Sequence, residues 1–177
     1  LLKLASGAGY ALGSLLRQIQ HLEEEIETLS KQVEQLGSTE RYAAAGKALM
    51  EQLKGVGLLT AMVFLTELGD MNRFANRKKI GSFLGLVPSS DESGENSDHK
   101  GHITHEGPVR GRKVLCQASW SRVRTDPLEK LIYGRLVKKN PKKKKIAVVA
   151  SMRRLGVRMW HIAGEAQAKA GIFKQAA

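Results

Sequence analysis

The sequence predicts a mainly α-helical protein: an N-terminal coiled coil or helical hairpin, then a compact helical domain with a helix-hairpin-helix-like turn and a long polar loop. Residues 12–36 carry apolar positions spaced alternately four and three apart, the periodicity of a coiled coil. Further along, apolar residues recur at helical spacing, and the best candidate for an extended segment is the short piece 101–104. Aromatic residues make up only 5% of the 177 residues, so we expect an aliphatic core. We divide the chain into the coiled coil or hairpin (1–53), the core with the turn and the polar loop (54–125), and a basic helical C-terminal part (126–177).

The N-terminal region is predicted to contain two helices. The apolar stripe of the first helix consists of Leu15, Ile19, Leu22, Ile26, Leu29, Val33 and Leu36. Gly37-Ser38 interrupts the stripe, and a second helix is expected from Thr39 to Leu53. The two helices could form an antiparallel hairpin, or the first could pair with another chain, and the sequence leaves both arrangements open. Because residues 1–16 lack an initiator Met and a basic leader, we expect the chain to begin inside a longer protein.

A glycine-rich turn is expected next. Residues 55–57, Gly-Val-Gly, precede an apolar helix from Leu58 to Leu68, which Gly69 ends. A glycine-x-glycine turn between two helices is similar to the helix-hairpin-helix motif, in which backbone N–H groups approach a DNA phosphate. Gly55 and Gly57 are therefore candidate nucleic-acid contacts, because a Cβ would hold the phosphate off. A plain connector between two helices is the alternative.

The remainder of the chain alternates helices with a polar segment. Asn76 is placed to cap a helix that extends to Leu86 and that Pro88 ends. The polar segment, Ser89 to Gly107, holds serines, acids, histidines and glycines, with Ile103 as its one large apolar residue. Three further helices are expected: from Val109 to a break at Asp126-Pro127, at 128–137 and at 146–168.

The charge of the chain is distributed unevenly. The net charge is +12, yet residues 1–54 carry six Lys or Arg and seven Asp or Glu, so the remainder carries +13. Residues 130–158 hold eleven Lys or Arg and no acid. Such one-sided charge indicates a polyanionic partner, most often nucleic acid, although a solvated tail is an alternative for the run Lys142 to Lys145. No apolar run approaches the ~20 residues of a membrane span. The single cysteine, Cys116, indicates a reducing compartment, and we expect it to be a small buried apolar residue.

Three stretches in fixed order carry a family resemblance. They are GVGLLTAMVFLTELGDMNRF, IGSFLGLVPSS and SGENSDHKGHITHEGPVRGRKVLCQASW. Their shared pattern is a GxG turn, an apolar helix ending in E-x-G-D, then R-F, G-L-x-P, a Ser-Gly pair, and G-x-I-T-x-x-G before a basic helix. This pattern resembles the C-terminal transposase domain of the insertion-sequence 110/1111 transposases, serine recombinases described as bridge-RNA-guided. The later segments RLVKKN and KKIAVVASMRRLGVRMW are similar to the C-terminal end of the same family.

The resemblance implies a role for one serine. In that family the serine of the Ser-Gly pair, here Ser93 followed by Gly94, is the nucleophile that attacks a DNA phosphate. The family also carries an N-terminal nuclease-like domain with four acids and divalent metal. We therefore expect this chain to be a fragment of a DNA transposase or site-specific serine recombinase, with no cofactor of its own and inactive in isolation. The implied partners are DNA, a structured guide RNA and further copies of the chain, joined through the coiled coil in the cytoplasm of a prokaryote; no membrane is involved.

The polar segment departs from the family at two positions, because Asp91 and Glu92 precede Ser93 where many members have an aromatic residue and a second serine. Two acids beside a serine raise the electrostatic cost of approaching a phosphate, unless metal or Lys and Arg compensate. A serine also needs a base, for which this loop offers these two acids and three histidines. The full set of predicted nucleic-acid contacts is Gly55, Gly57, Gly94, Arg110, Arg112, Lys113, Lys142, Lys143, Lys144, Lys145, Arg153 and Arg154.

The three histidines of the polar segment raise the question of a metal site. His99, His102 and His105 are spaced three apart, as zinc ligands can be, but no CxxC accompanies them. We expect them to be solvated or to contact phosphate, and we expect no metal site. The alternative function for the whole chain is a non-catalytic basic helical module that binds DNA or RNA and dimerises through the coiled coil.

Overall fold

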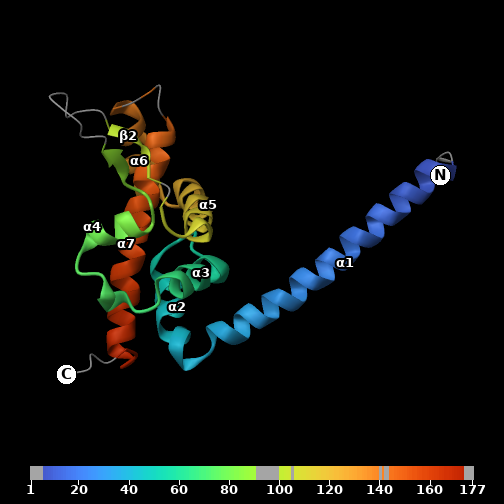
Figure 1. Cartoon of the computed structure of the whole chain (residues 1–177), viewed down its shortest axis with the longest axis horizontal. Coiled ribbons are helices and arrows are strands. Elements are labelled where there is room, and N and C mark those ends of the chain that lie inside the picture. Colours follow the sequence, from blue (N-terminus) through green and yellow to red (C-terminus); the bar gives the residue numbers. More distant parts are fainter. Residues whose placement is uncertain (1–5, 91–99, 105, 140, 142–143, 174–177) are drawn as a thin grey trace.

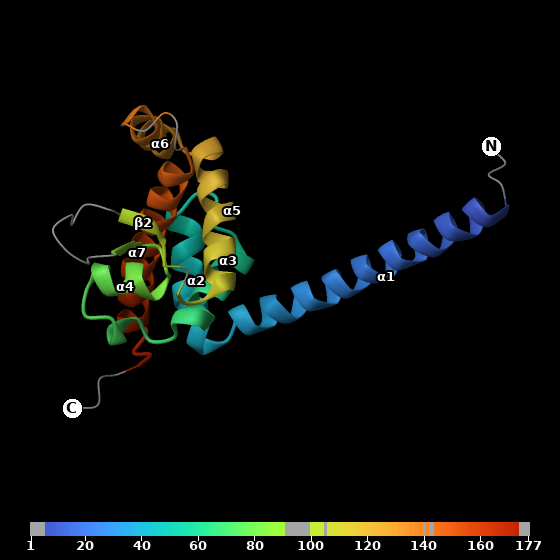
Figure 2. The ribbon, with the colours of Figure 1, turned by 45° about the horizontal axis from the view of Figure 1, so that its top comes forward.

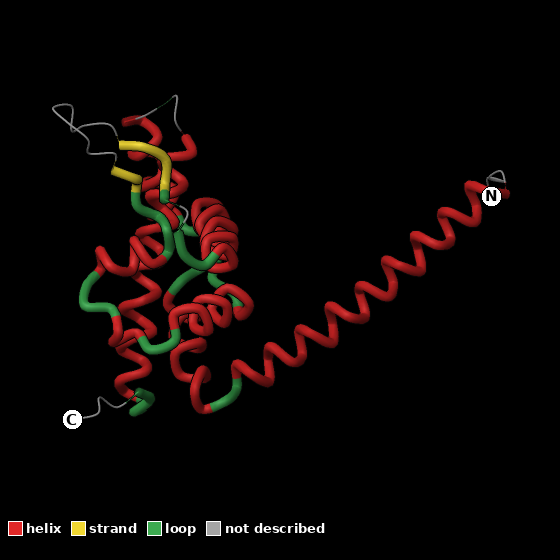
Figure 3. Tube along the Cα trace, viewed as in Figure 1, coloured by secondary structure: helices red, strands yellow, loops and turns green. Residues whose placement is uncertain are grey.

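The computed structural model describes residues 6–90, 100–104, 106–139, 141 and 144–173. Helices dominate them, which confirms the mainly α prediction (Figures 1 and 3). The elements in chain order are α1 Ser6–Gly37, α2 Glu40–Gln52, α3 Leu58–Leu68, the 3₁₀ helix η1 Met71–Arg73, α4 Arg77–Phe83, β1 Pro88–Ser90, β2 Lys100–Ile103, α5 Val109–Thr125, α6 Pro127–Lys139 and α7 Lys144–Lys169.

The long helix α7 is the axis of a compact body. Helices α2, α4, α5 and α6 and the turn η1 all pack against it, as Figures 1 and 2 show. Helix α3 packs on α2 and α5, and the fully buried side chains of the body include Leu49, Phe64, Leu65, Leu115 and Met159, so the core is mostly aliphatic, as expected. Burial of one such side chain is worth about 1.5–3 kcal/mol. The core therefore joins segments from both ends of the chain into one unit.

Helix α1 stands apart from this body. It extends away as a single long helix (Figure 1), and the side chains of its apolar stripe are mostly exposed, with Leu22 at 59% and Ile26 at 62%. It meets the body at its C-terminal end, where Gly37 lies against Leu58 and Met62 of α3. The antiparallel pairing with α2 is therefore not formed. Among the helices that the structure describes, none is long and apolar enough to cross a membrane.

The start of α4 follows the sequence prediction, whereas its end does not. The Oδ1 atom of Asn76 accepts hydrogen bonds from the backbone N–H groups of Lys78 (3.0 Å) and Lys79 (3.2 Å), so the predicted cap is confirmed. The prediction that this helix continues to Leu86 is wrong. It ends at Phe83, because the chain turns at Gly85 with a φ of 63°. Proline 88 begins a strand instead of ending the helix.

A small antiparallel hairpin carries the polar loop. Strand β1 pairs with β2, with Pro88 opposite Ile103 and Ser90 opposite Lys100, so the extended piece expected at 101–104 is confirmed. The Ser89 hydroxyl donates a hydrogen bond to the His102 carbonyl oxygen across the pair at 3.1 Å. Residues 91–99 join the two strands and lie outside the described residues.

The base of this hairpin is a close crossing of two backbone segments. Gly85 (φ 63°) and Gly107 (φ 103°) both lie in the left-handed region that favours glycine. A Cβ on Gly85 would collide with the carbonyl oxygen of Glu106, and a Cβ on Gly107 would collide with that of Phe83. Both glycines are thus required by space as well as by backbone conformation.

An arginine from α5 holds the same crossing. The Nη1 atom of Arg112 donates to the carbonyl oxygen of Gly107 at 3.0 Å, with longer contacts of 3.4 Å to those of Leu84 and Glu106. In addition, the Thr104 amide donates to the Val87 carbonyl at 3.0 Å. The two ends of the hairpin are therefore fixed to each other and to α5.

This crossing makes Gly107→Ala strongly destabilising. We expect the variant to lower the free energy of unfolding by about 2 kcal/mol or more, because alanine has both an unfavourable φ and no space. The matched control is Gly134→Ala within α6, where an added Cβ meets nothing within 4 Å. Helix propensity predicts a gain of about 0.5–1 kcal/mol for the control. Urea denaturation measures the free energy of unfolding of both variants. An equal change in the two would contradict the close backbone contact at Gly107.

Candidate nucleic-acid interface

The Gly-Val-Gly turn packs tightly on one side and is open on the other. A Cβ on Gly55 would lie 3.0 Å from Ser121 Oγ and 3.1 Å from Arg122 Cγ, so this glycine allows the turn to contact α5. Val56 is buried in the core. Gly57 precedes α3 as its N-cap and is exposed, and a Cβ there would meet nothing within 4 Å. Both predicted phosphate contacts are exposed, but only at Gly57 would an added Cβ point into open space.

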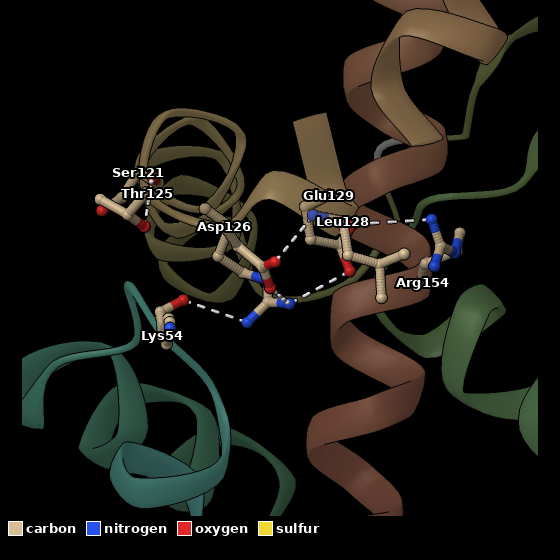
Figure 4. Close-up of polar contacts among 8 residues, drawn as sticks. Lys54, Ser121, Thr125, Asp126, Leu128, Glu129 and Arg154 are labelled. Atoms are coloured by element: carbon tan, nitrogen blue, oxygen red, sulfur yellow. Dashed lines mark hydrogen bonds and ion pairs between the residues drawn. The ribbon is translucent and has the colours of Figure 1, made fainter. Parts of the chain in front are cut away.

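A buried arginine connects this turn to the C-terminal helices. Arg122 of α5 is only 3% exposed. Its Nη1 donates to the Lys54 carbonyl oxygen at 3.0 Å, and its Nη2 contacts Asp126 Oδ2 at 3.2 Å and Glu129 Oε1 at 3.1 Å. Figure 4 shows these contacts between the turn, the end of α5 and the start of α6. The guanidinium thus has acceptors from three segments of the chain.

The two carboxylates of this cluster have further partners. Glu129 Oε2 lies 3.6 Å from Nη1 of Arg154 on α7, and Asp126 Oδ1 accepts from the Leu128 amide at 3.0 Å, as a helix cap does. Arg154, a predicted nucleic-acid contact, is therefore also a structural residue, although its side chain remains 46% exposed. Sequence reasoning missed the cluster, and the four-residue spacing of Arg122 and Asp126 was the available signal.

The other predicted cations of the body divide into two groups. Arg112 and Arg153 contact the protein itself, the former at the hairpin base and the latter over α4, where a Cβ on Gly81 would lie 2.9 Å from Arg153 Nε. Arg110 and Lys113 are exposed on α5. Only this second pair presents its charge mainly to solvent.

The junction of α6 and α7 is strongly basic. Lys138 and Lys139 end α6, Lys144 and Lys145 begin α7, and all four are exposed. Figures 1 and 3 show this junction and the β1–β2 hairpin at the same end of the molecule. Four of the predicted site residues lie outside the described residues: Ser93, Gly94, Lys142 and Lys143. The strands that flank the serine segment and this basic junction therefore lie at the same end of the molecule.

The histidines are only partly described. His102 is exposed in β2, whereas His99 and His105 lie outside the described residues. Within the described ranges, no group of three His, Cys, Asp or Glu side chains could hold a metal ion.

Part of the chain matches a known protein family. Residues 47–134 match the model of the Transposase IS116/IS110/IS902 family. This transposase-family segment covers about half of the chain and runs from α2 into α6. It includes the Gly-Val-Gly turn, the crossing at the hairpin base and the Arg122 cluster. These three features thus lie within the segment that defines the similarity.

Individual relatives agree with the family match. The chain is 37% identical over 78 residues to "Putative transposase y4qE" of Sinorhizobium fredii, which is 44% of this chain and 20% of that protein. It is 32% identical over 117 residues to "Putative transposase y4rJ" of the same organism, covering 64% and 29%. It is 31% identical over 70 residues to the "Transposase for insertion sequence element IS1111A" of Coxiella burnetii, covering 40% and 19%. The chain thus spans less than a third of the length of these relatives.

The Arg122 cluster leads to a stability prediction. Arg122→Met should lower the free energy of unfolding by about 3–5 kcal/mol, because it leaves two largely buried carboxylates without their common partner. The matched control is Arg124→Met on the same helix, since Arg124 is exposed and donates to the Trp120 carbonyl oxygen of its own helix. We expect the control to change stability by about 0.5 kcal/mol or less. A similar loss in both variants, measured by thermal and urea unfolding, would argue against the cluster.

Proposed function

We propose that this chain is the serine-bearing part of a DNA transposase, in which Ser93 attacks a DNA phosphate during strand exchange. The observation that carries the proposal is the family match over residues 47–134, which encloses the loop of Ser93. The packing of the hairpin base supports it. Gly85, Gly107 and Arg112 fix the base of the hairpin, whose two strands lead into and out of that loop, on α5. A nucleophile for phosphoryl transfer needs such positioning above all.

The proposed step conserves atoms and charge in a simple way. The Ser93 oxygen forms a bond to phosphorus while the bond from phosphorus to a sugar oxygen breaks. The serine proton passes to a base, and the sugar oxygen leaves as a hydroxyl after taking up a proton. A sugar hydroxyl of the other strand then attacks the phosphoserine bond and releases the serine. Asp91 and Glu92 are the nearest bases along the sequence, and the divalent metal of the reaction is expected in an acidic nuclease-like domain.

The nucleic acid is proposed to contact the basic end of the molecule. The exposed lysines at the α6–α7 junction lie at the same end as the hairpin (Figure 1), so a phosphate backbone held there would pass along the end of the molecule whose strands flank Ser93 in the sequence. Arg110, Lys113 and Gly57 are proposed as further contacts. Both the DNA and a structured guide RNA would bind through phosphate, and this accords with the charge of +12. The setting would be the cytoplasm of a prokaryote.

The serine assignment is tested in the complete transposase, with the nuclease-like domain present. We expect wild-type protein to form a covalent protein–DNA adduct, visible as a slowly migrating band on a denaturing gel, and Ser93→Ala to abolish it. Ser97→Ala, a serine-to-alanine change in the same loop, is the control and should retain the adduct. Recombination by Ser93→Ala would exclude this residue as the nucleophile. Salt-sensitive DNA binding without an adduct in any variant would favour the alternative, a non-catalytic binding module.

We also propose that α1 pairs with α1 of another copy of the chain. Its exposed stripe has coiled-coil spacing, and a solvated helix of this length gains stability from burying such a stripe.

Light scattering tests this pairing directly. We expect Leu22→Asp to lower the mass of the assembly to that of one chain, because a carboxylate would lie in the seam. Gln20→Asp, on the same helix but off the stripe, should leave the mass unchanged. If Leu22→Asp has the same mass as wild type, α1 is not the seam.

A further inference from the structure

A pocket of about 330 Å³ lies between the segment after α3 and the C-terminal half of α7. Figure 1 shows this segment, which leads to α4, passing beside α7 at the end of the molecule away from α6. The walls from α7 include Trp160, His161 and Glu165, and those from the other side include Asn72 and Phe74. The pocket is thus separate from the β1–β2 hairpin and the basic junction.

Hydrogen bonds hold the two walls of the pocket together. Trp160 Nε1 donates to the Met71 carbonyl oxygen at 2.9 Å, which fixes the orientation of the indole. Gln167, only 2% exposed, accepts from the Met71 amide at 3.2 Å and donates to the Gly69 carbonyl oxygen at 3.1 Å. The pocket is therefore formed before any ligand arrives, which lowers the entropic cost of binding.

The lining suits a flat aromatic ligand that carries N–H donors. The Trp160 and His161 rings lie 4.5 Å apart between centroids, and Phe74 lies in the opposite wall. Such rings stack with nucleobases of any sequence. The exposed carboxylate of Glu165 can accept a hydrogen bond from an exocyclic amine, as carboxylates do from cytosine N4. The amide of Asn72 can donate and accept.

The charge beside the pocket suits a phosphate backbone. Arg73 lies over the rings of Phe74 (4.5 Å) and Phe83 (4.8 Å), so the guanidinium is held next to the aromatic wall. Arg77, Lys78 and Lys79 follow on α4, and all are exposed. Residues 71–90 contain these four cations and no acid.

We propose that this pocket binds a nucleobase of single-stranded nucleic acid, with preference for bases that carry an exocyclic amine, while phosphates of the strand contact Arg73 and the start of α4. The site goes beyond the proposed function, because it needs neither Ser93 nor a covalent step. This face of the molecule would then bind unpaired bases, whereas the separate surface near the hairpin would bind phosphates. The same chemistry serves DNA and RNA, so both are tested.

Tryptophan fluorescence of the 177-residue chain reports on the pocket. In a Trp120→Phe background, Trp160 is the only tryptophan. Titration with short oligodeoxycytidine should quench its emission, with an affinity roughly tenfold higher than for oligodeoxythymidine, which lacks the amine. Oligocytidine with ribose tests RNA in parallel. Glu165→Gln should reduce the preference for cytosine several-fold, whereas Glu51→Gln, the same change of charge at an exposed position on α2, should not.

A blocking variant separates occupancy of the pocket from folding. Ala75 lines the pocket and is exposed, so Ala75→Met should fill it without disturbing the core. We expect roughly tenfold weaker binding of oligodeoxycytidine at an unchanged melting temperature. Ala11→Met, at an exposed position on α1, is the control and should bind as wild type.

Three results would overturn the proposal. In the first, oligonucleotides bind by fluorescence anisotropy while Trp160 emission stays constant and Ala75→Met has no effect; the strand then lies elsewhere. In the second, no oligonucleotide binds at all. In the third, Ala75→Met leaves oligonucleotide binding intact but prevents association with the nuclease-like domain, which identifies a protein occupant. None of these results affects the Ser93 adduct, so failure of the pocket and failure of the transposase proposal are distinguishable.

Discussion

The buried guanidinium of Arg122 is the interaction on which the arrangement of the body depends. A charge removed from water is tolerated only where acceptors surround it. Here the Lys54 carbonyl, Asp126 and Glu129 supply them, and each belongs to a different segment. Because Glu129 also contacts Arg154, the position of the Gly-Val-Gly turn is linked to those of α5, α6 and α7. These elements therefore keep a fixed geometry with respect to one another, which a site assembled from several of them requires.

The same principle operates at the hairpin base. Arg112 donates hydrogen bonds to carbonyl oxygens of two backbone segments, which cross at a point where only glycine fits. Two arginines of α5 therefore bond to groups of the protein itself. Both contribute to the positive net charge, which by itself would suggest that they contact nucleic acid. Other cations face solvent, among them Arg110 and Lys113, the lysines of the α6–α7 junction and the cluster on α4. Net charge indicates a polyanionic partner, but burial decides which cations can meet it.

The molecule separates its candidate functions in space. The β1–β2 hairpin and the lysine-rich junction lie at one end of α7, and the aromatic pocket is lined by residues of its C-terminal half (Figure 1). Helix α1 extends away from both and exposes its apolar stripe. The three proposed roles, which are phosphate binding near the hairpin, binding of unpaired bases and association with a second copy, therefore use separate surfaces of the molecule.

Local chemistry was readable from the sequence, because helix periods, caps and breakers act within a turn or two. Asn76 as a cap, the helix from Leu58 to Leu68 and the break at Asp126-Pro127 all follow from near neighbours. The ordered motif also predicted the transposase family, and within it Ser93, which stays a prediction because its segment lies outside the described residues.

Only the tertiary structure decided the remaining features, because they depend on contacts between distant residues. The crossing of Gly85 with the segment before α5 and the internal roles of Arg112 and Arg122 follow from carbonyl groups on other elements. The pocket joins Met71 to Trp160, 89 positions apart. Such contacts between distant residues are determined by packing, and neither the helical periodicity nor the capping residues of the sequence predict them.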